Sequence, residues 1–430
     1  MSHVRNRPRF LDAKQVLKTM KIPQSAKMLL TAAICGGAIF LVTNVYFAGK
    51  AMPFVFFTLT LASVILVLIR VGRSWLDILF AAVSAALLGA ISVWHFHYQP
   101  NWESCVSFMG LGSLVVLGLR AAWSEGEKQK LLALAFAPSF LFAAFMVFAG
   151  AVLEQTQVWH PKVLDLYLFS FDASLHVQLA FILGQTYAMW PWFKAIGVAL
   201  YIGLPLPMAM VYSGQLMRDR AKAYPAMVAF LVTGPIGILF YNLFPALGPA
   251  HIFLRDFPWQ PMTTFQAAHL LREPIGVKGI QNAIPSLHMA WVLLAWWYSR
   301  GLSIWEQGIA LTFVVFTALA TLGTGEHYFI DLVVAYPFSV MIQSLCAFPL
   351  RWTARERVTG MVYGLLGTLL WMLALGHAPN VFWLSPAIPW VCCLLTIASA
   401  IFFHRKLESA AEDVVQRQSE AAAEMAVALS

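Results

Sequence analysis

Charged residues are scarce in this chain of 430 residues: Asp, Glu, Lys and Arg make up 11% of it, whereas 60% of the residues are hydrophobic. Ordinary soluble domains contain about 25% charged residues, so this composition excludes a soluble globular protein. Cysteine is scarce too. Only five are present, and four of them lie inside apolar runs, which excludes a disulfide-stapled scaffold.

Long apolar runs take the place of the missing charge. A membrane-spanning helix needs ~20 mostly apolar residues, because it must satisfy every backbone hydrogen bond without water. We therefore predict an all-α polytopic membrane protein with about twelve transmembrane helices, whose cores lie at 28–48, 53–70, 75–95, 104–119, 131–153, 195–215, 226–246, 285–299, 305–323, 327–349, 358–376 and 384–403.

The basic residues predict the orientation of these helices, because Lys and Arg in short loops stay on the cytoplasmic side. With both termini in the cytoplasm, 22 of the 28 basic residues face inward, and the six that face outward are Lys50, Lys162, Lys194, Arg255, Arg272 and Lys278. The net charge of +8 therefore reflects topology, and we expect no nucleic-acid partner. No small-residue cleavage site precedes the first span, so we interpret the start of the chain as a cytoplasmic surface segment.

The distribution of polar residues predicts the domain organisation, because they concentrate between 154 and 337. The core is expected to have six helices, with a surface helix at 160–184 and an outer loop at 247–284. The predicted parts are a basic cytoplasmic segment (1–27), a four-helix accessory bundle (28–119), the catalytic core (131–349), two additional transmembrane helices (358–403) and a cytoplasmic tail (404–430).

Three polar motifs are predicted at the outer ends of core helices. They are "YNLFPALGPAH" (241–251), "IPSLH" (284–288) and "GTGEHYFID" (323–331). His327 and Asp331 are four residues apart, so on a helix the carboxylate can lie beside the imidazole and fix its tautomer. His327 is therefore a candidate nucleophile, and His288 a candidate proton donor to the leaving group.

The start of the "IPSLH" helix is a candidate anion site. Pro285 suits the first turn of a helix, and the free N–H groups there, with the Ser286 hydroxyl, can bind a phosphate. An attacking imidazole, an acid and an oxyanion site together favour phosphoryl transfer through a phosphohistidine. The same side chains match no compact metal-binding spacing, and we expect neither a metal nor a cofactor.

"PSLH" followed by "HYFIDL" resembles the second and third signature motifs of the type 2 phosphatidic acid phosphatase superfamily. "GEHYFIDL" is most similar to the branch of the inositol phosphorylceramide synthases, an inositolphosphotransferase-like group. The resemblance covers about 131–349. It implies that His327 is the nucleophile, Asp331 its orienting carboxylate, His288 the leaving-group acid and Ser286 a phosphate contact.

This chain departs from the superfamily at the phosphate-binding cations. The first motif normally carries a Lys and an Arg, yet "FYNLFPALGPA" has neither, and Ala320 and Thr321 stand where the third motif has Ser-Arg. Leu287 replaces the usual Gly of the second motif. The candidates to replace these cations are Arg272 and Lys278 of the outer loop, with Arg255 and His251 behind them.

Four side chains near the motifs are candidate substrate contacts: Tyr241, His251, Glu326 and Asp172. Each has a simpler alternative. Glu326 can cap the following helix, where an acid is favourable in any case. Asp172, like Asp165 and His176, can be a polar group of a surface helix.

We thus predict an enzyme of the inner, plasma-type membrane with its active site on the outer face. It would move a phospho-head group from a phospholipid donor to a hydroxyl on a lipid or glycan acceptor. A lipid phosphate phosphatase that uses water, acting on phosphatidic acid or a polyprenyl phosphate, is the alternative. A transporter or scaffold of twelve spans fits less well, because transporters carry their polar residues near the bilayer midplane. The oligomeric state stays open.

Overall fold

The computed structural model describes residues 23–48, 54–72, 74–96 and 101–428. Most of the predicted basic segment 1–27 therefore lies outside the described residues. The described part of the chain is all-α, and its one β-type contact is an isolated bridge between Val163 and Ile275.

The first six helices are α2 (Gln24–Ala48), α3 (Phe54–Gly72), α4 (Trp75–Phe96), α5 (Trp102–Trp123), α6 (Gly126–Trp159) and α7 (Asp165–Ser174). They are followed by α8 (Leu179–Met189), α9 (Pro191–Ile202), α10 (Pro205–Arg218), α11 (Arg220–Leu243), α12 (Pro249–Phe253), η1 (Leu254–Asp256) and α13 (Thr264–Ala268). The last are α14 (Leu287–Tyr298), α15 (Ile304–Gly323), α16 (Phe329–Leu345), α17 (Arg355–His377), η2 (Pro379–Trp383) and α18 (Ala387–Ala428).

The described residues do not confirm the twelve predicted membrane spans. Within the described ranges, eight helices are long and apolar enough, and up to ten if each of two bent pairs is one span. Length is the physical reason for part of the difference. The predicted span at 285–299 forms α14, whose 12 residues rise only about 18 Å, well short of a ~30 Å hydrocarbon core.

The segment 160–184, expected to be one surface helix, is divided into two. α7 and α8 meet at 89°. Most of α7 is buried, including both carboxylates that gave the segment its amphipathic character, Asp165 and Asp172. These acids accept hydrogen bonds from distant backbone, which is why they turn inward.

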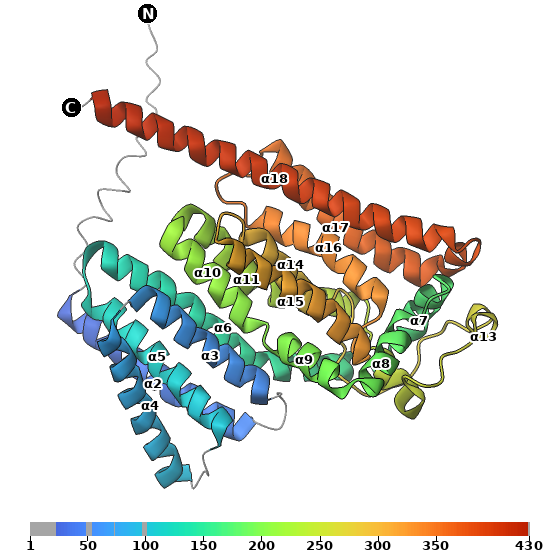
Figure 1. The fold of residues 1–430 in the computed structure, drawn as a ribbon, viewed down its shortest axis with the longest axis horizontal. Coiled ribbons are helices and arrows are strands. Elements are labelled where there is room, and N and C mark those ends of the chain that lie inside the picture. Colours follow the sequence, from blue (N-terminus) through green and yellow to red (C-terminus); the bar gives the residue numbers. More distant parts are fainter. Residues whose placement is uncertain (1–22, 49–53, 73, 97–100, 429–430) are drawn as a thin grey trace, which may run out of the picture.

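Helices α2 to α5 form a group at one side of the molecule, beside the helices of the later chain (Figure 1). α3 makes the main contact with that later part, through α10 and α6. A polar link reinforces the contact: Arg70, at the end of α3, binds the Glu306 carboxylate at 2.5 Å and the Met210 carbonyl at 2.8 Å.

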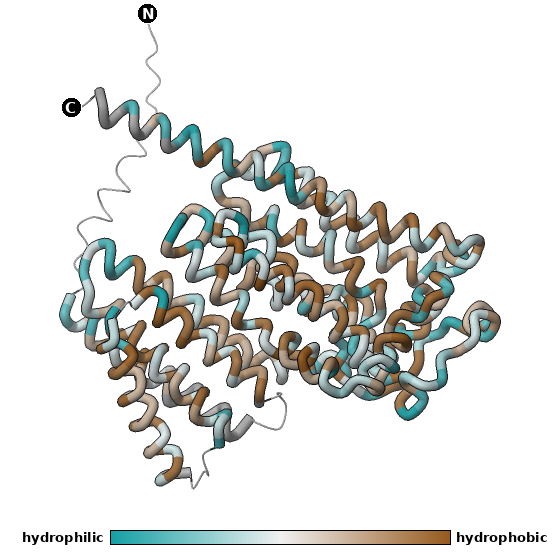
Figure 2. Tube along the Cα trace, in the orientation of Figure 1, coloured by the Kyte–Doolittle hydropathy of each residue, from teal (hydrophilic) through white to brown (hydrophobic). Residues whose placement is uncertain are grey.

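Most ion pairs join helix ends that the charge pattern assigns to the cytoplasmic side. Besides Arg70–Glu306, the pairs Lys222–Glu412 and Arg300–Glu408 attach the second half of α18 to the ends of α11 and α14. Figure 2 shows that this half of α18 is more hydrophilic than its first half. α18 is one helix of 42 residues, about 63 Å long, so the predicted tail continues the last apolar helix as far as residue 428.

Candidate functional site

Three side chains from two helix starts form a buried hydrogen-bonded series. The Ser286 hydroxyl lies 3.2 Å from Nε2 of His327, and Nδ1 of His327 lies 3.4 Å from Oδ2 of Asp331. Ser286 is the N-cap of α14, and Asp331 lies in the first turn of α16. The backbone closes the junction, since Ser286 N–H donates to the Asp331 carbonyl at 3.2 Å. All three side chains are buried.

The neighbours of this series determine where its protons lie. The Asp331 carboxylate can only accept, so Nδ1 of His327 carries the proton and donates it. Ser286 Oγ already accepts from Met289 N–H at 3.4 Å, and its own hydrogen is free to point at His327. Nε2 of His327 therefore holds a lone pair, which is the form that a nucleophilic imidazole needs.

His288 is the second residue of α14, and its side chain contacts Tyr201 of α9. Nδ1 of His288 is 3.3 Å from the Tyr201 hydroxyl, and the two rings pack with centroids 4.2 Å apart. Phe56 of α3 packs edge-on against the imidazole at 5.9 Å. Among the described residues, Tyr201 is the one hydrogen-bonding partner of His288, so no direct bond joins the two histidines. The sequence pattern missed Tyr201 because it lies outside all three motifs.

Asp172 holds the start of the helix that follows His327. Its carboxylate accepts from Phe329 N–H at 2.6 Å and from Ile330 N–H at 3.2 Å, the first two residues of α16. These groups have no acceptor within the helix, and a buried N–H without an acceptor is costly. The structure thus gives Asp172 a positioning contact, whereas we expected a substrate contact or a surface group.

Asp165 does the same for the "YNLFPALGPAH" segment. It accepts from Gly248 N–H at 2.8 Å and from Leu247 N–H at 3.1 Å. Gly248 has φ +131°, and a side chain there would meet the backbone of Glu326, so only glycine allows this approach. Ala250 N–H then donates to the Gly325 carbonyl at 3.0 Å. The segment consequently lies against the residues that precede His327.

This arrangement brings His251 to Glu326, two of the predicted substrate contacts. Nε2 of His251 lies 3.6 Å from the Glu326 carboxylate, and both side chains are partly exposed. The carboxylate raises the pKa of His251, and the imidazole lowers the pKa of Glu326. The ion pair with Glu326 therefore favours the protonated, cationic form of His251.

The two cations of the outer loop differ in their contacts. The Arg272 guanidinium donates to Ser170 Oγ at 2.7 Å, Asn380 Oδ1 at 2.5 Å and the Ala268 carbonyl at 3.2 Å. It thereby ties the outer loop to α7 and η2, away from His327. Lys278 is exposed and has no side-chain partner in the part of the chain that the structure describes. Tyr241, the remaining candidate, is buried on α11.

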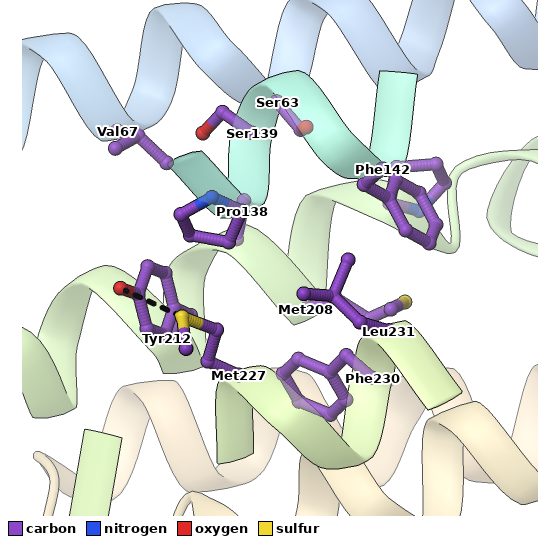
Figure 3. A pocket seen from close by; sticks show the side chains of 12 residues that line it. Ser63, Val67, Pro138, Ser139, Phe142, Met208, Tyr212, Met227, Phe230 and Leu231 are labelled. Carbon is purple, nitrogen blue, oxygen red and sulfur yellow. Dashed lines mark hydrogen bonds between the residues drawn. The ribbon is translucent and has the colours of Figure 1, made fainter. Parts of the chain in front are cut away.

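Two cavities lie apart from these side chains. One of about 50 Å³ lies where α3 and α6 meet α10 and α11, and Figure 3 shows that apolar side chains such as Val67, Met208 and Phe230 line it. Its volume is too small for a lipid head group. Another of about 460 Å³ lies under α18, beside Lys222 and Arg300. Over the described ranges, no three His, Cys, Asp or Glu side chains gather as metal ligands would.

The fold and the site define a multi-pass α-helical membrane protein with a buried Ser–His–Asp series at one end of its helices. Residues 166–346 match the family model of the PAP2 superfamily, which supports this superfamily for the segment. The matched region contains Ser286, His288, His327 and Asp331. No curated protein and no solved structure matches the chain. Enzymes of the phosphatase and phosphotransferase type that act on lipids are therefore the class to which the site points.

Proposed function

We propose that the protein is a phosphotransferase that moves a phospho-head group from a phospholipid to a hydroxyl acceptor through a phosphohistidine at His327. The observation that carries the proposal is the series Ser286–His327–Asp331, which leaves Nε2 of His327 with a lone pair. We further propose the inositol phosphorylceramide synthase-like branch, because the third motif reads "GEHYFIDL". The acceptor would be a lipid or a glycan at the outer face of a plasma-type membrane.

In the first half of the reaction, Nε2 of His327 attacks the phosphorus of the donor phospholipid. The bond between phosphorus and the diacylglycerol oxygen breaks, and the leaving alkoxide takes a proton from His288. The new phosphohistidine ring carries a positive charge, which the Asp331 carboxylate stabilises.

In the second half, the acceptor hydroxyl gives its proton to His288 as its oxygen attacks phosphorus. The phosphorus–nitrogen bond then breaks, and His327 regains its lone pair. Both histidines return to their starting protonation, so the cycle needs no further reactant.

Phosphate binding is proposed for the Ser286 hydroxyl, His251 and Lys278. His251 forms an ion pair with Glu326, the residue before His327. The Lys278 side chain has no partner within the described residues. Arg272 is a weaker candidate, because leaving Ser170 and Asn380 would break two hydrogen bonds that hold the outer loop.

A lipid phosphatase is the second candidate, and the match to the PAP2 superfamily favours it. Its first half-reaction is the same, and water replaces the acceptor hydroxyl in the second. The cations that bind a terminal phosphate monoester in this superfamily are absent from this chain, which favours the transferase.

One experiment separates these functions. Purified protein in phospholipid vesicles is given a donor that is radiolabelled in its head group, with and without ceramide as acceptor lipid. We expect an acid-labile label on the protein that His327→Ala abolishes, and label in a new lipid only when ceramide is present. Release of the labelled head group without acceptor would identify the hydrolase. Turnover retained by a folded His327→Ala variant would overturn the mechanism.

A further inference from the structure

Tyr201 lies against the one catalytic histidine for which the sequence supplies no orienting partner. It belongs to α9, at the bend where α9 and α10 meet at 48°. Its hydroxyl is 3.3 Å from Nδ1 of His288, and its ring covers the imidazole with an interplanar angle of 35°. The contact links two helices that are far apart in the chain.

The direction of this hydrogen bond follows from the surroundings of the two groups. A phenol hydroxyl has one hydrogen to donate, and among the described residues Nδ1 of His288 is the one acceptor that it reaches. If Nδ1 carried the proton instead, the Tyr201 hydrogen would have no acceptor within hydrogen-bonding distance among the described residues. A partly buried polar group left unpaired is costly, so Tyr201 donates.

This direction decides the tautomer of His288. With Nδ1 accepting, the proton of the neutral ring lies on Nε2. His327 has the opposite arrangement, because Asp331 accepts from its Nδ1 and leaves a lone pair on Nε2. The two histidines are thus prepared for opposite roles, one with a proton to give and the other with a lone pair for attack.

We propose that Tyr201 is a positioning residue that holds His288 in the tautomer protonated on Nε2 and supplies the proton that balances its loss. As Nε2–H passes to the leaving alkoxide, the Tyr201 hydroxyl hydrogen passes to Nδ1, so the ring stays neutral and the negative charge moves from the alkoxide to the Tyr201 oxygen. In the second half, the proton of the acceptor hydroxyl enters at Nε2 and Nδ1 returns its proton to Tyr201. The inference rests on the proposed function for the role of His288 as an acid. Phe56 of α3 contributes packing alone, because its ring lies edge-on against the imidazole.

The test combines Tyr201→Phe, which keeps the ring but removes the hydroxyl, with substrates of two kinds. Loss of the proton donor should slow the reaction of a lipid, because its leaving alkoxide needs a proton. It should have little effect on the rate for an aryl phosphodiester such as bis(p-nitrophenyl) phosphate, because that leaving group is stable as an anion. We expect Tyr201→Phe to lower kcat for the lipid by about 10²-fold or more, the contribution of general acid catalysis, with kcat for the aryl ester unchanged.

Tyr212→Phe is the matched control. It removes a hydroxyl from α10, the next helix, where Tyr212 donates to the Leu134 carbonyl and does not touch His288. We expect the same kcat as wild type for both substrates. Equal losses for the lipid and the aryl ester in Tyr201→Phe, or no loss for either, would overturn the proposal.

A spectroscopic measurement tests the tautomer without any turnover. Protein labelled with nitrogen-15 in histidine shows which ring nitrogen of His288 is protonated, and His288→Gln assigns the signal by its disappearance. We expect protonated Nε2 in wild type and in Tyr212→Phe, and a mixture of tautomers in Tyr201→Phe. A signal that is the same in all three proteins would refute the hydrogen bond. Absence of phospho-transfer in wild type would instead refute the proposed function alone.

Discussion

Asp331→Asn is the substitution that most directly tests the buried series around His327. The carboxylate accepts from Nδ1 of His327 at 3.4 Å and from Tyr328 N–H at 2.8 Å through the same oxygen, Oδ2. An asparagine with its amide oxygen in that place keeps both hydrogen bonds. Its nitrogen would take the site of Oδ1, which is buried and without a hydrogen-bond partner in the described chain. The substitution therefore removes charge with little change of shape.

The cost of losing this charge is expected at the phosphohistidine stage, when the ring of His327 is positive. Two unit charges about 3.4 Å apart attract by about 5 kcal/mol at an effective dielectric constant of about 20. Because about 1.36 kcal/mol is a factor of ten in rate, this corresponds to a loss of about 10³ to 10⁴ in the rate of phosphoenzyme formation. A lower bound of about tenfold follows if only the strength of a charged hydrogen bond is lost.

The assay is the single-turnover rate at which label from the donor head group appears on the protein. The free energy of unfolding should change little, because a buried carboxylate with one unpartnered oxygen becomes an amide with one unpartnered nitrogen. Asp256→Asn is the control, since Asp256 is an exposed carboxylate of the outer loop. A rate within about twofold of wild type in a folded Asp331→Asn protein would refute the electrostatic role.

Three further predictions follow from the contacts of the site and its supports. Asp172→Ala should lower the free energy of unfolding by about 1–2 kcal/mol, because two N–H groups of α16 lose their acceptor. Chemical denaturation measures this change. Asp219→Ala is the control, because it removes a carboxylate that caps α11 at an exposed site, and it should cost less than Asp172→Ala. Glu326 raises the pKa of His251, so substrate affinity should hold above the ordinary His pKa and fall as pH rises through the raised value. In Glu326→Gln, the pH at which KM begins to rise should be lower than in wild type. The same pH dependence of KM in both proteins would exclude His251 as the phosphate-binding cation. Arg70→Met and Glu306→Gln should show a coupling of about 0.5–1 kcal/mol in a double-mutant cycle of unfolding, whereas additive effects would mean that the pair adds nothing to the docking of α3.

The ion pair of His251 and Glu326 also makes stability depend on pH in a defined window. The contribution of Glu326, whose pKa is lowered, is lost as pH falls through its folded value. The contribution of His251, whose pKa is raised, is lost as pH rises through its folded value. The pair therefore stabilises the outer segment between these two values and on neither side of them.

The sequence by itself determined the features that depend on neighbours within one helix. Apolar runs predicted the helices, because a lipid-facing segment must satisfy its own backbone hydrogen bonds. The four-residue spacing of His327 and Asp331 predicted their contact, since residues i and i+4 share a helix face. Ser286 follows the same logic: a hydroxyl before an apolar run is typical of an N-cap, and the structure has it there.

Only the tertiary structure decided which distant groups complete the site. Asp172 and Tyr201 meet α16 and His288 across long stretches of chain, and no local pattern records such a meeting. Arg272, an unpaired outer cation in the sequence, is held by Ser170 and Asn380 in the fold. The local sequence pattern determines which face of a helix is apolar. The packing of whole helices determines which buried polar groups find partners, because a buried donor needs an acceptor and that acceptor can come from any part of the chain.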